Sequence, residues 1–431
     1  MATVPPASTV AGHGPQRQRP SGALISVAGA AGFTKPDREL ARTVSIVGVG
    51  DSDYAADYRA SRAAGPGYVP PDDLSLATIA FERAVADSGL RREDVDGLNT
   101  CFMYAPADVG EVCSTLGIHP RYALAEGNIM DDVIPPAVVA LASGRCDTIA
   151  LLYAAAPRAA TKRVYGGTTY TDDRGTPVSY YYFTPWGWSS QAAHWAFIFR
   201  NYQNVFGATE ADLGSIAVAL RTHAQRNENA IMRAPLTIDD YLESRYIVRP
   251  LHLFDMCLVN NGAVCLILRR TDASTGLPHV PVEVAGWGHA KVSADKMRNL
   301  VVERLRPQFD EAGREAFAMA GLSRSDVGLF QGYDASSIHL VDQIEGYGFT
   351  DPGTGLEFCQ DGQLDLGGSL PTNTSGGMLS EAYMHGWNHV VEAVRQLRHE
   401  AGERQVTDVT TSMSSVATTD SAHPLLLTRG G

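Results

Sequence analysis

No stretch of the chain approaches the roughly 20 consecutive apolar residues that a helix needs to span a bilayer, and the N-terminus has no apolar signal core followed by a cleavage site. Positive charge is also scarce, because 35 Lys and Arg stand against 48 Asp and Glu and leave a net charge of −13. This imbalance argues against nucleic acid or an anionic membrane surface as a general partner. We therefore expect a soluble, cytoplasmic globular protein.

Cysteine patterns that bind metals or build disulfide frameworks are absent. The six cysteines contain no Cys-x-x-Cys pair, and no histidine cluster at zinc spacing accompanies them. Cys265, for example, lies inside the apolar run Ala263–Leu268. We expect reduced, buried thiols without chemistry, and neither a metal nor another cofactor in this chain.

The sequence does contain an alternation of strand and helix patterns. Residues 1–42, rich in Pro, Ala, Gly, Ser and Arg without periodicity, predict a flexible tail. The alternation then predicts strands at Val44–Gly50, Val95–Phe102, Asp147–Ala155, Asn261–Arg269, Val280–Ala290, Val327–Tyr333, Gln405–Ser412 and His423–Thr428. It predicts helices at Asp73–Ser88, Asp131–Ser143, Asp310–Ala320, Ser336–Tyr347 and Gly386–Arg398. The two halves repeat the same order, which predicts a duplicated α/β fold.

Residues 157–247 interrupt this alternation. They contain the aromatic stretch Tyr180–Trp188 and helical patterns over Ala192–Phe206 and Glu210–Asn227. A long excursion between core strands usually carries a binding function or covers a site. The alternative is an inserted subdomain that only builds an interface.

The stretch Leu366–Arg398 is the most informative for chemistry. Glycine pairs at 367–368 and 376–377 bracket an extended Leu-Pro-Thr-Asn, and a long amphipathic helical pattern follows. Backbone amides at such a turn can converge beside Tyr383 and His385. That geometry suits an oxyanion.

Several stretches together, in this order, carry a family resemblance: Val44–Gly50, Asp94–Leu98, Arg221–Ala224 with Asn227, Pro250-Leu251 with Asp255–Cys257 and Asn261–Ala263, Tyr333-Asp334 with Glu345–Phe349, and Leu370–Gly377. From about residue 43 onward the chain resembles the thiolase superfamily, in the sterol-carrier-protein-X thiolase and lipid-transfer-protein branch. The resemblance implies an α/β thiolase fold with a duplicated five-layered αβαβα core, usually dimerised. The N-terminal half would cover 43–272, including a loop domain at about 157–247, and the C-terminal half would cover 273–431.

The resemblance also implies an acyl-CoA substrate lying under the excursion. The phosphates of CoA need local positive charge in an acidic chain. Arg158, Lys162 and Arg163 are the nearest candidates. A solvated positive face is the alternative explanation for these residues.

The chain departs from the thiolase pattern at each reacting position. The nucleophilic cysteine, which belongs at the N-terminus of a buried helix, aligns with Gly127, and the second catalytic cysteine would fall in Thr411–Ala417, which contains none. Tyr383 stands where thiolases have a catalytic histidine, and Tyr333 where they have an asparagine or, in this branch, often a histidine. Covalent acyl transfer therefore loses its nucleophile.

Two phenols in these places imply chemistry that stabilises an enolate or oxyanion without an acyl-enzyme. Retro-aldol cleavage of a β-hydroxyacyl-CoA meets this demand. We expect Tyr383 to be the principal acid/base and Tyr333 its partner, and which of them takes the hydroxyl proton is open. His385 would tune a phenol or bind a water.

Backbone groups near the glycines complete the expected site. The amides at Gly127, Gly376 and Gly377 are the candidate oxyanion donors. Asn373 belongs to the same substrate-binding set and is expected to shape the turn rather than to react.

Within the branch, the pattern looks like that of the actinobacterial steroid side-chain-cleaving aldolases. These enzymes release a ketone or aldehyde and a short acyl-CoA, in complex with a small acyl-CoA-binding partner built from a zinc ribbon and an OB-fold. We expect the same reaction and partner here, as well as a homodimer, with zinc confined to the partner. The alternatives are a thiolase-like acyl-CoA condensing enzyme and a catalytically silent acyl-CoA-binding scaffold.

Overall fold

The computed structural model describes residues 35–64, 68–104, 107–127, 130–157, 190–291, 307–418 and 421–431. Its strands are β1 (Val44–Asp51), β2 (Gly97–Phe102), β3 (Tyr122–Leu124), β4 (Thr148–Ala155), β5 (Tyr246–Val248), β6 (Leu251–His252), β7 (Gly262–Arg270), β8 (Val282–Trp287), β9 (Ala290–Lys291), β10 (Leu329–Gly332), β11 (Thr411–Ala417) and β12 (Ser421–Arg429). Its α-helices are α1 (Tyr54–Ala63), α2 (Asp73–Ser88), α3 (Val109–Leu116), α4 (Met130–Ala142), α6 (Gln191–Phe206), α7 (Glu210–Ala224), α8 (Ile238–Glu243), α10 (Pro307–Ala320), α11 (Ser337–Gly346), α12 (Gly355–Gln360), α13 (Gly377–Ser380) and α14 (Trp387–Arg398).

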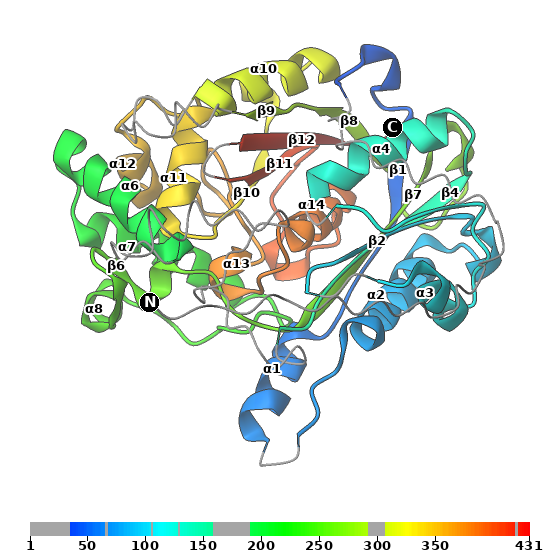
Figure 1. Cartoon of the computed structure of the whole chain (residues 1–431). Helices are drawn as coiled ribbons and strands as arrows, with labels where there is room; N and C mark the ends of the chain where they lie inside the picture. Colours follow the sequence, from blue (N-terminus) through cyan, green and yellow to red (C-terminus); the bar gives the residue numbers. More distant parts are fainter. Residues whose placement is uncertain are drawn as a thin grey trace, which may run out of the picture. The chain divides into compact units, whose positions relative to one another are not determined.

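One mixed sheet runs through both halves of the chain in the order β10-β11-β12-β8-β1-β7-β4-β2-β3, with β9 beside β12 (Figure 1). From β1, the strands β7 and β4 follow in antiparallel pairing and β2 pairs parallel to β4. From β8, the strands β12 and β11 follow in antiparallel pairing and β10 pairs parallel to β11. The halves therefore share one pairing pattern and meet where β1 pairs with β8, which confirms the predicted duplication.

Helices α4 and α14 form the central layer. They contact strands of both halves, and one apolar cluster joins their side chains to those of β1, β4, β7 and β8. On the outer faces, α2 covers β1, β7 and β4, whereas α10 covers β8 and β12 (Figure 1). This arrangement is the αβαβα layering of the thiolase fold.

Capping residues explain where α2 begins and ends. The Asp72 side chain accepts a hydrogen bond from the amide of Ser75 at 2.8 Å, and Gly89 closes the helix with a φ of +69°. The apolar side chains between these caps, such as Phe81, are fully buried against the sheet. Sequence spacing and glycine punctuation therefore predicted this helix with its observed bounds.

The flexible tail predicted at residues 1–42 is too long. Arg38–Leu40 forms a short 3-10 helix, and the amide of Arg42 donates to the carbonyl of Val284 at 2.9 Å. Leu40 packs against the central apolar cluster, and this burial orders a segment whose composition suggested flexibility. Residues 1–34 lie outside the described residues.

The strand predicted at Gln405–Ser412 is misplaced, because the observed strand β11 starts at Thr411. Val406 and Val409 are buried and mimic a strand pattern, but the Gln405 side chain donates to the carbonyl of Gln396 at 2.9 Å. The true strand consists mostly of small polar residues and is nevertheless buried throughout. Its neighbours on both sides of the sheet, rather than its own hydrophobicity, decide its place.

The described part of the predicted insertion is mainly helical and lies beside the turn that precedes Tyr383. Helices α6 and α7 contact α11, and α7 also contacts α13. Residues 158–189 lie outside the described residues, with the predicted aromatic stretch Tyr180–Trp188 among them. The expected boundary between halves, at residues 272 and 273, falls in the connection from β7 to β8 and stays a prediction.

Candidate active site

Tyr333 directly follows β10, where two amide side chains fix the backbone. The Gly332 amide donates to Asn373 Oδ1 at 2.8 Å, and Asn373 Nδ2 donates to the Gly332 carbonyl at 2.9 Å. On the other side, Gln343 of α11 accepts from the Tyr333 amide at 3.0 Å and donates to its carbonyl at 2.7 Å. The position of Tyr333 is thus set from both the turn and α11.

Tyr383 reaches the same place from the turn after α13. Its amide donates to Oδ1 of Asn260 at 2.8 Å, and its hydroxyl lies 3.0 Å from the hydroxyl of Tyr333. Both side chains are buried, at 5% and 6% exposure. The structure therefore brings together the two phenols predicted to be partners, and their catalytic roles stay a prediction.

His385 lies close to both phenols. Its ring centroid is 5.8 Å from that of Tyr383 and 5.9 Å from that of Tyr333. Its φ is +54°, a left-handed conformation that is uncommon for a residue with a side chain. The turn therefore holds this imidazole beside the tyrosine pair, and its role in tuning a phenol or binding a water stays a prediction.

The carboxylate of Asp334 fills the space at the start of α13. It accepts from the amides of Met378 and Leu379 at 3.0 and 3.1 Å. A Cβ atom on Gly377, whose φ is +61°, would lie 2.2 Å from Asp334 Oδ2, so the position requires glycine. These two amides bind a neighbouring carboxylate and are not directed at a ligand.

Gly376 is explained by close packing against α7. Its φ is +106°, and a Cβ atom would lie 2.6 Å from the Cβ of Ala224. Its amide donates to the carbonyl of Asn373 at 2.9 Å, and Asn373 shapes the turn as expected. Because that amide is engaged within the turn, an oxyanion role for Gly376 would need a shared or rearranged hydrogen bond. The oxyanion roles of Gly376 and Gly377 stay predictions.

Gly127 lies just before α4, which agrees with the helix N-terminus where thiolases carry their nucleophile. It is exposed with a φ of +80°, and a Cβ atom on it would lie 3.4 Å from the Cβ of Asp132. Burial raises the pKa of Asp132 to about 6. An oxyanion role for the Gly127 amide stays a prediction.

The six cysteines share a raised thiol pKa. Burial raises the pKa of all six thiols. Cys257, whose amide donates to the carbonyl of Ala335 beside the Tyr333 loop, has a pKa raised to about 12 by burial. A thiol with a raised pKa forms little thiolate near neutral pH.

His339 on α11 was missed at the sequence level although it contacts Tyr333. The two rings meet edge to face with centroids 5.6 Å apart, and the imidazole stacks on Trp195 of α6 at 4.0 Å. Burial, helped by the nearby His194, lowers the pKa of His339 to about 3. The neutral imidazole of His339 therefore packs against both Tyr333 and Trp195. The only sequence signal for this contact was the helix predicted directly after Tyr333.

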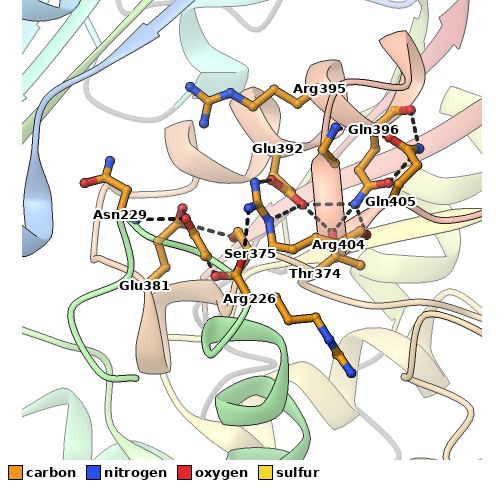
Figure 2. Close-up of polar contacts among 12 residues, drawn as sticks. Arg226, Asn229, Thr374, Ser375, Glu381, Glu392, Arg395, Gln396, Arg404 and Gln405 are labelled. Carbon is orange, nitrogen blue, oxygen red and sulfur yellow. Dashed lines mark hydrogen bonds and ion pairs between the residues drawn. The ribbon is translucent and has the colours of Figure 1, made fainter. Parts of the chain in front are cut away.

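A buried polar network that sequence patterns also missed lies beneath the turn (Figure 2). Glu392 of α14 accepts from Thr374 Oγ1 at 2.8 Å and from Arg404 at 2.9 Å. Burial opposes ionisation of Glu392, but the Arg404 guanidinium holds its pKa below the usual value. Glu381, at the end of α13, accepts from Ser375 Oγ at 2.7 Å. The carboxylates of Glu392 and Glu381 thus hold the turn in place through Thr374 and Ser375.

The predicted CoA-binding residues Arg158, Lys162 and Arg163 lie outside the described residues. In the described ranges no helix is long and apolar enough to cross a membrane. Nor does any group of three or more His, Cys, Asp or Glu side chains in those ranges form a metal site. The predictions on cofactors and CoA contacts stay predictions.

Comparison with known proteins shows the family and the fold of this chain. Residues 286–426 match the family described as Thiolase C-terminal domain-like. The "Steroid side-chain-cleaving aldolase" of Thermomonospora curvata is 31% identical over 83% of this chain and 91% of its own. The "17-hydroxy-3-oxo-4-pregnene-20-carboxyl-CoA lyase" of Mycobacterium tuberculosis is 34% identical over 83% of this chain and 92% of its own. This chain belongs to the aldolase family of the thiolase superfamily.

A solved structure supports this family membership. The "Ltp2-ChsH2(DUF35) aldolase" superposes with a TM-score of 0.77 at 29% identity, covering 90% of this chain and 98% of that chain. The prediction of an aldolase of the thiolase superfamily is therefore confirmed.

Proposed function

We propose that the chain cleaves a β-hydroxyacyl-CoA of the steroid side-chain type by a retro-aldol reaction that needs no cysteine nucleophile. The observation that carries the proposal is the 3.0 Å contact between the hydroxyls of Tyr333 and Tyr383. The phenols stand at the two positions where thiolases keep other polar groups, while Gly127 takes the nucleophile position. The family membership of the chain adds independent support.

The reaction is a proton transfer coupled to carbon–carbon cleavage. One phenol of the pair, as its phenolate, removes the proton of the β-hydroxyl, and the O–H electron pair forms the new carbonyl. The electrons of the breaking bond pass to the α carbon as a thioester enolate. A proton returned from the pair to that carbon gives the shortened acyl-CoA beside the ketone or aldehyde. No oxidant or reductant is required.

Binding of the substrate and the partner forms the second part of the proposal. Arg158, Lys162 and Arg163 would contact the CoA phosphates, and a homodimer would form, as the family resemblance implies. A DUF35 protein, of the kind named with the related solved structure, would be the partner. Its zinc-ribbon and OB-fold composition and its contribution to acyl-CoA binding belong to the same proposal.

The proposal is tested by incubating the chain, with and without such a partner, with a β-hydroxyacyl-CoA that carries a tertiary alcohol. Mass spectrometry should detect ketone and shortened acyl-CoA in equal amounts. Turnover should persist after cysteine alkylation, because the reaction uses no thiolate. Loss of turnover on alkylation, in protein that stays folded, would contradict a nucleophile-free site.

The two alternatives give different results in the same assay. A silent scaffold would bind the CoA ester tightly and release no ketone with any partner. A thiolase-like condensing enzyme would join two acyl-CoA molecules and leave the β-hydroxyacyl-CoA intact. The paired phenols favour an active site, since a silent pocket needs no polar groups at both reacting positions.

A further inference from the structure

Glu381 is a buried carboxylate two residues before Tyr383. Only 3% of its surface is exposed. Oε2 accepts from Ser375 Oγ and from Asn388 Nδ2, both at 2.7 Å, and Oε1 accepts from Asn227 Nδ2 at 2.9 Å. Burying a carboxylate is costly unless hydrogen bonds compensate, so these bonds make Glu381 a strong local constraint (Figure 2).

The partners of Glu381 come from three separate segments. Ser375 belongs to the glycine-containing turn before α13, and Asn388 belongs to the first turn of α14. Asn227 follows α7 and also donates to the carbonyl of Ser375 at 2.9 Å. Asn388 in turn donates to the carbonyl of Ala382, next to Tyr383, at 3.2 Å. The carboxylate therefore joins the segments before and after Tyr383.

Backbone contacts reinforce the same junction. The amide of Ile231 donates to the carbonyl of Glu381 at 3.0 Å, and the amide of Met232 donates to that of Ser380 at 2.9 Å. The loop after α7 thus lies against the end of α13 through main chain and through Asn227. Movement of Glu381 would be transmitted to Tyr383, whose hydroxyl must stay at 3.0 Å from Tyr333.

We propose that Glu381 is a positioning residue, whose charged carboxylate holds Tyr383 in register with Tyr333. The proposal rests on the retro-aldol function proposed above. It assigns to Glu381 no contact with the substrate. Its effect is on the geometry of the reacting phenols. A substitution of Glu381 should therefore change kcat more than KM, because a small misplacement of catalytic groups strongly lowers the rate of the chemical step.

The protonation state of Glu381 provides a readout. Burial raises its pKa to about 7, against the lowering effect of the Asn388 and Ser375 hydrogen bonds. The ionised form has acceptors for all three donors, whereas a proton on either oxygen faces a donor and removes a bond. The titratable and charged groups that face Glu381 are Asp51 of β1, Tyr54 of α1, Glu392 and Arg395 of α14, and Arg404 of the 3-10 helix Gly402–Arg404. We expect kcat to rise with pH through about 7 as Glu381 ionises.

The variant Glu381→Gln tests the proposal in the full-length chain. It keeps the shape but places an –NH2 group against a donor. At pH 8 we expect kcat to fall roughly 10- to 100-fold with KM changed by less than about threefold. The step in kcat near pH 7 should disappear in the variant. Unchanged kcat and an unchanged pH step in Glu381→Gln would overturn the proposal.

Glu392→Gln is the matched control. Glu392 is as buried, at 1% exposure, and also anchors the turn, but it binds Thr374 and Arg404 and does not contact the residues beside Tyr383. We expect this variant to lose stability, because Arg404 loses its partner, and to lose less kcat than Glu381→Gln in protein that is equally folded. An equal or larger loss of kcat in Glu392→Gln would show that the turn responds to general loosening and would refute the specific role.

A second measurement separates this proposal from the proposed function. NMR of tyrosine labelled with 13C at the hydroxyl-bearing carbon, assigned with Tyr333→Phe and Tyr383→Phe, reports on the phenol pair without turnover. We expect both signals to shift in Glu381→Gln and to stay close to their original positions in Glu392→Gln. Signals that shift in a protein without aldolase activity would reject the function and keep the positioning role. Unshifted signals in an active protein would reject the positioning role alone.

Discussion

The phenols of Tyr333 and Tyr383 share one hydrogen bond, so one hydroxyl donates and the other accepts. The accepting hydroxyl keeps its own proton, which it can donate to an oxygen that develops negative charge. When that proton is absent, the donor stabilises the phenolate through a charge-assisted hydrogen bond. A pair of tyrosines can therefore act as acid and base, whereas an isolated phenol with an ordinary pKa of about 10 is a poor base near neutral pH.

Removing one hydroxyl should disable this pair. Tyr383→Phe retains the buried ring and should keep the fold, while kcat falls by roughly 100-fold or more because the acid/base group is lost. Tyr333→Phe should give a loss of similar size, and the double variant should be little worse than either single one, since the groups act as a unit. Steady-state kinetics together with thermal melting would measure both effects.

Tyr347→Phe is a matched control for these variants. Tyr347 is buried at 1% exposure, and its hydroxyl pairs with Ser415 Oγ at 2.7 Å. Its loss should cost about 1 kcal/mol of stability and leave kcat within about threefold. Full turnover in Tyr383→Phe would show that the principal catalytic assignment is wrong.

Elements with local signals were predictable from the sequence, and elements decided by distant contacts were not. The helix Asp73–Ser88 carries its own cap and terminal glycine, so its bounds were predicted. The polar strand β11 is buried by its neighbours, so its start was misjudged. Likewise, Asn227 lies far along the chain from Glu381, which it contacts at 2.9 Å, and no periodicity links the two.

In the candidate site, too, positions marked by a sequence pattern were predictable, whereas contacts between distant segments were not. The thiolase pattern marks the positions of Tyr333 and Tyr383, but it does not show what surrounds the glycine turn. The sequence predicted oxyanion donors at Gly376 and Gly377, and it could not show that the Asp334 carboxylate accepts from the next two amides, those of Met378 and Leu379. That acceptor follows Tyr333 in the chain, and only the fold brings it to α13.

The glycine turn as an element gives a stability prediction. Gly377→Ala places a Cβ atom 2.2 Å from Asp334 Oδ2 in a left-handed conformation and should lower the free energy of unfolding by roughly 2–4 kcal/mol. Gly367→Ala in the same stretch meets nothing within 4 Å and should change it by less than about 1 kcal/mol. Urea unfolding of both variants makes the comparison, and equal stabilities would contradict the close packing of Asp334.

At the scale of the whole molecule, the candidate site combines segments that lie far apart in the chain. Gly127 and α4 come from the first half, whereas Tyr333 and Tyr383 come from the second. Met130 of α4 belongs to the same apolar cluster as the two tyrosines, and Asn227 after α7 brings the insertion against the turn.

Two buried carboxyls with raised pKa values should give the whole protein an unusual pH dependence. Burial raises the pKa of Glu381 to about 7 and that of Asp255 to about 6. A folded-state pKa above the unfolded value means that the native protein binds more protons, so the stability linked to these groups is present at low pH and is lost as pH rises through about 6 to 7. Asp51 and Glu392 have lowered pKa values and titrate below this window.

We therefore expect Glu381 and Asp255 each to contribute a fall in the free energy of unfolding between about pH 5 and pH 7, of up to about 1.4 kcal/mol per pH unit while the group titrates. Burial lowers the pKa of His339 and of His423 to about 3, and these histidines contribute a rise in stability over the same range. The contribution of each carboxyl is therefore the difference in slope between the unmodified protein and its variant. Urea unfolding at half-unit steps of pH measures this slope. Glu381→Gln and Asp255→Asn should each remove one of these contributions, and because Asp255 binds Tyr241 whereas Glu381 binds Ser375, their effects should add. Slopes in both variants equal to that of the unmodified protein would mean that neither carboxyl is protonated in the native state and that the charge of Glu381 is compensated in another way.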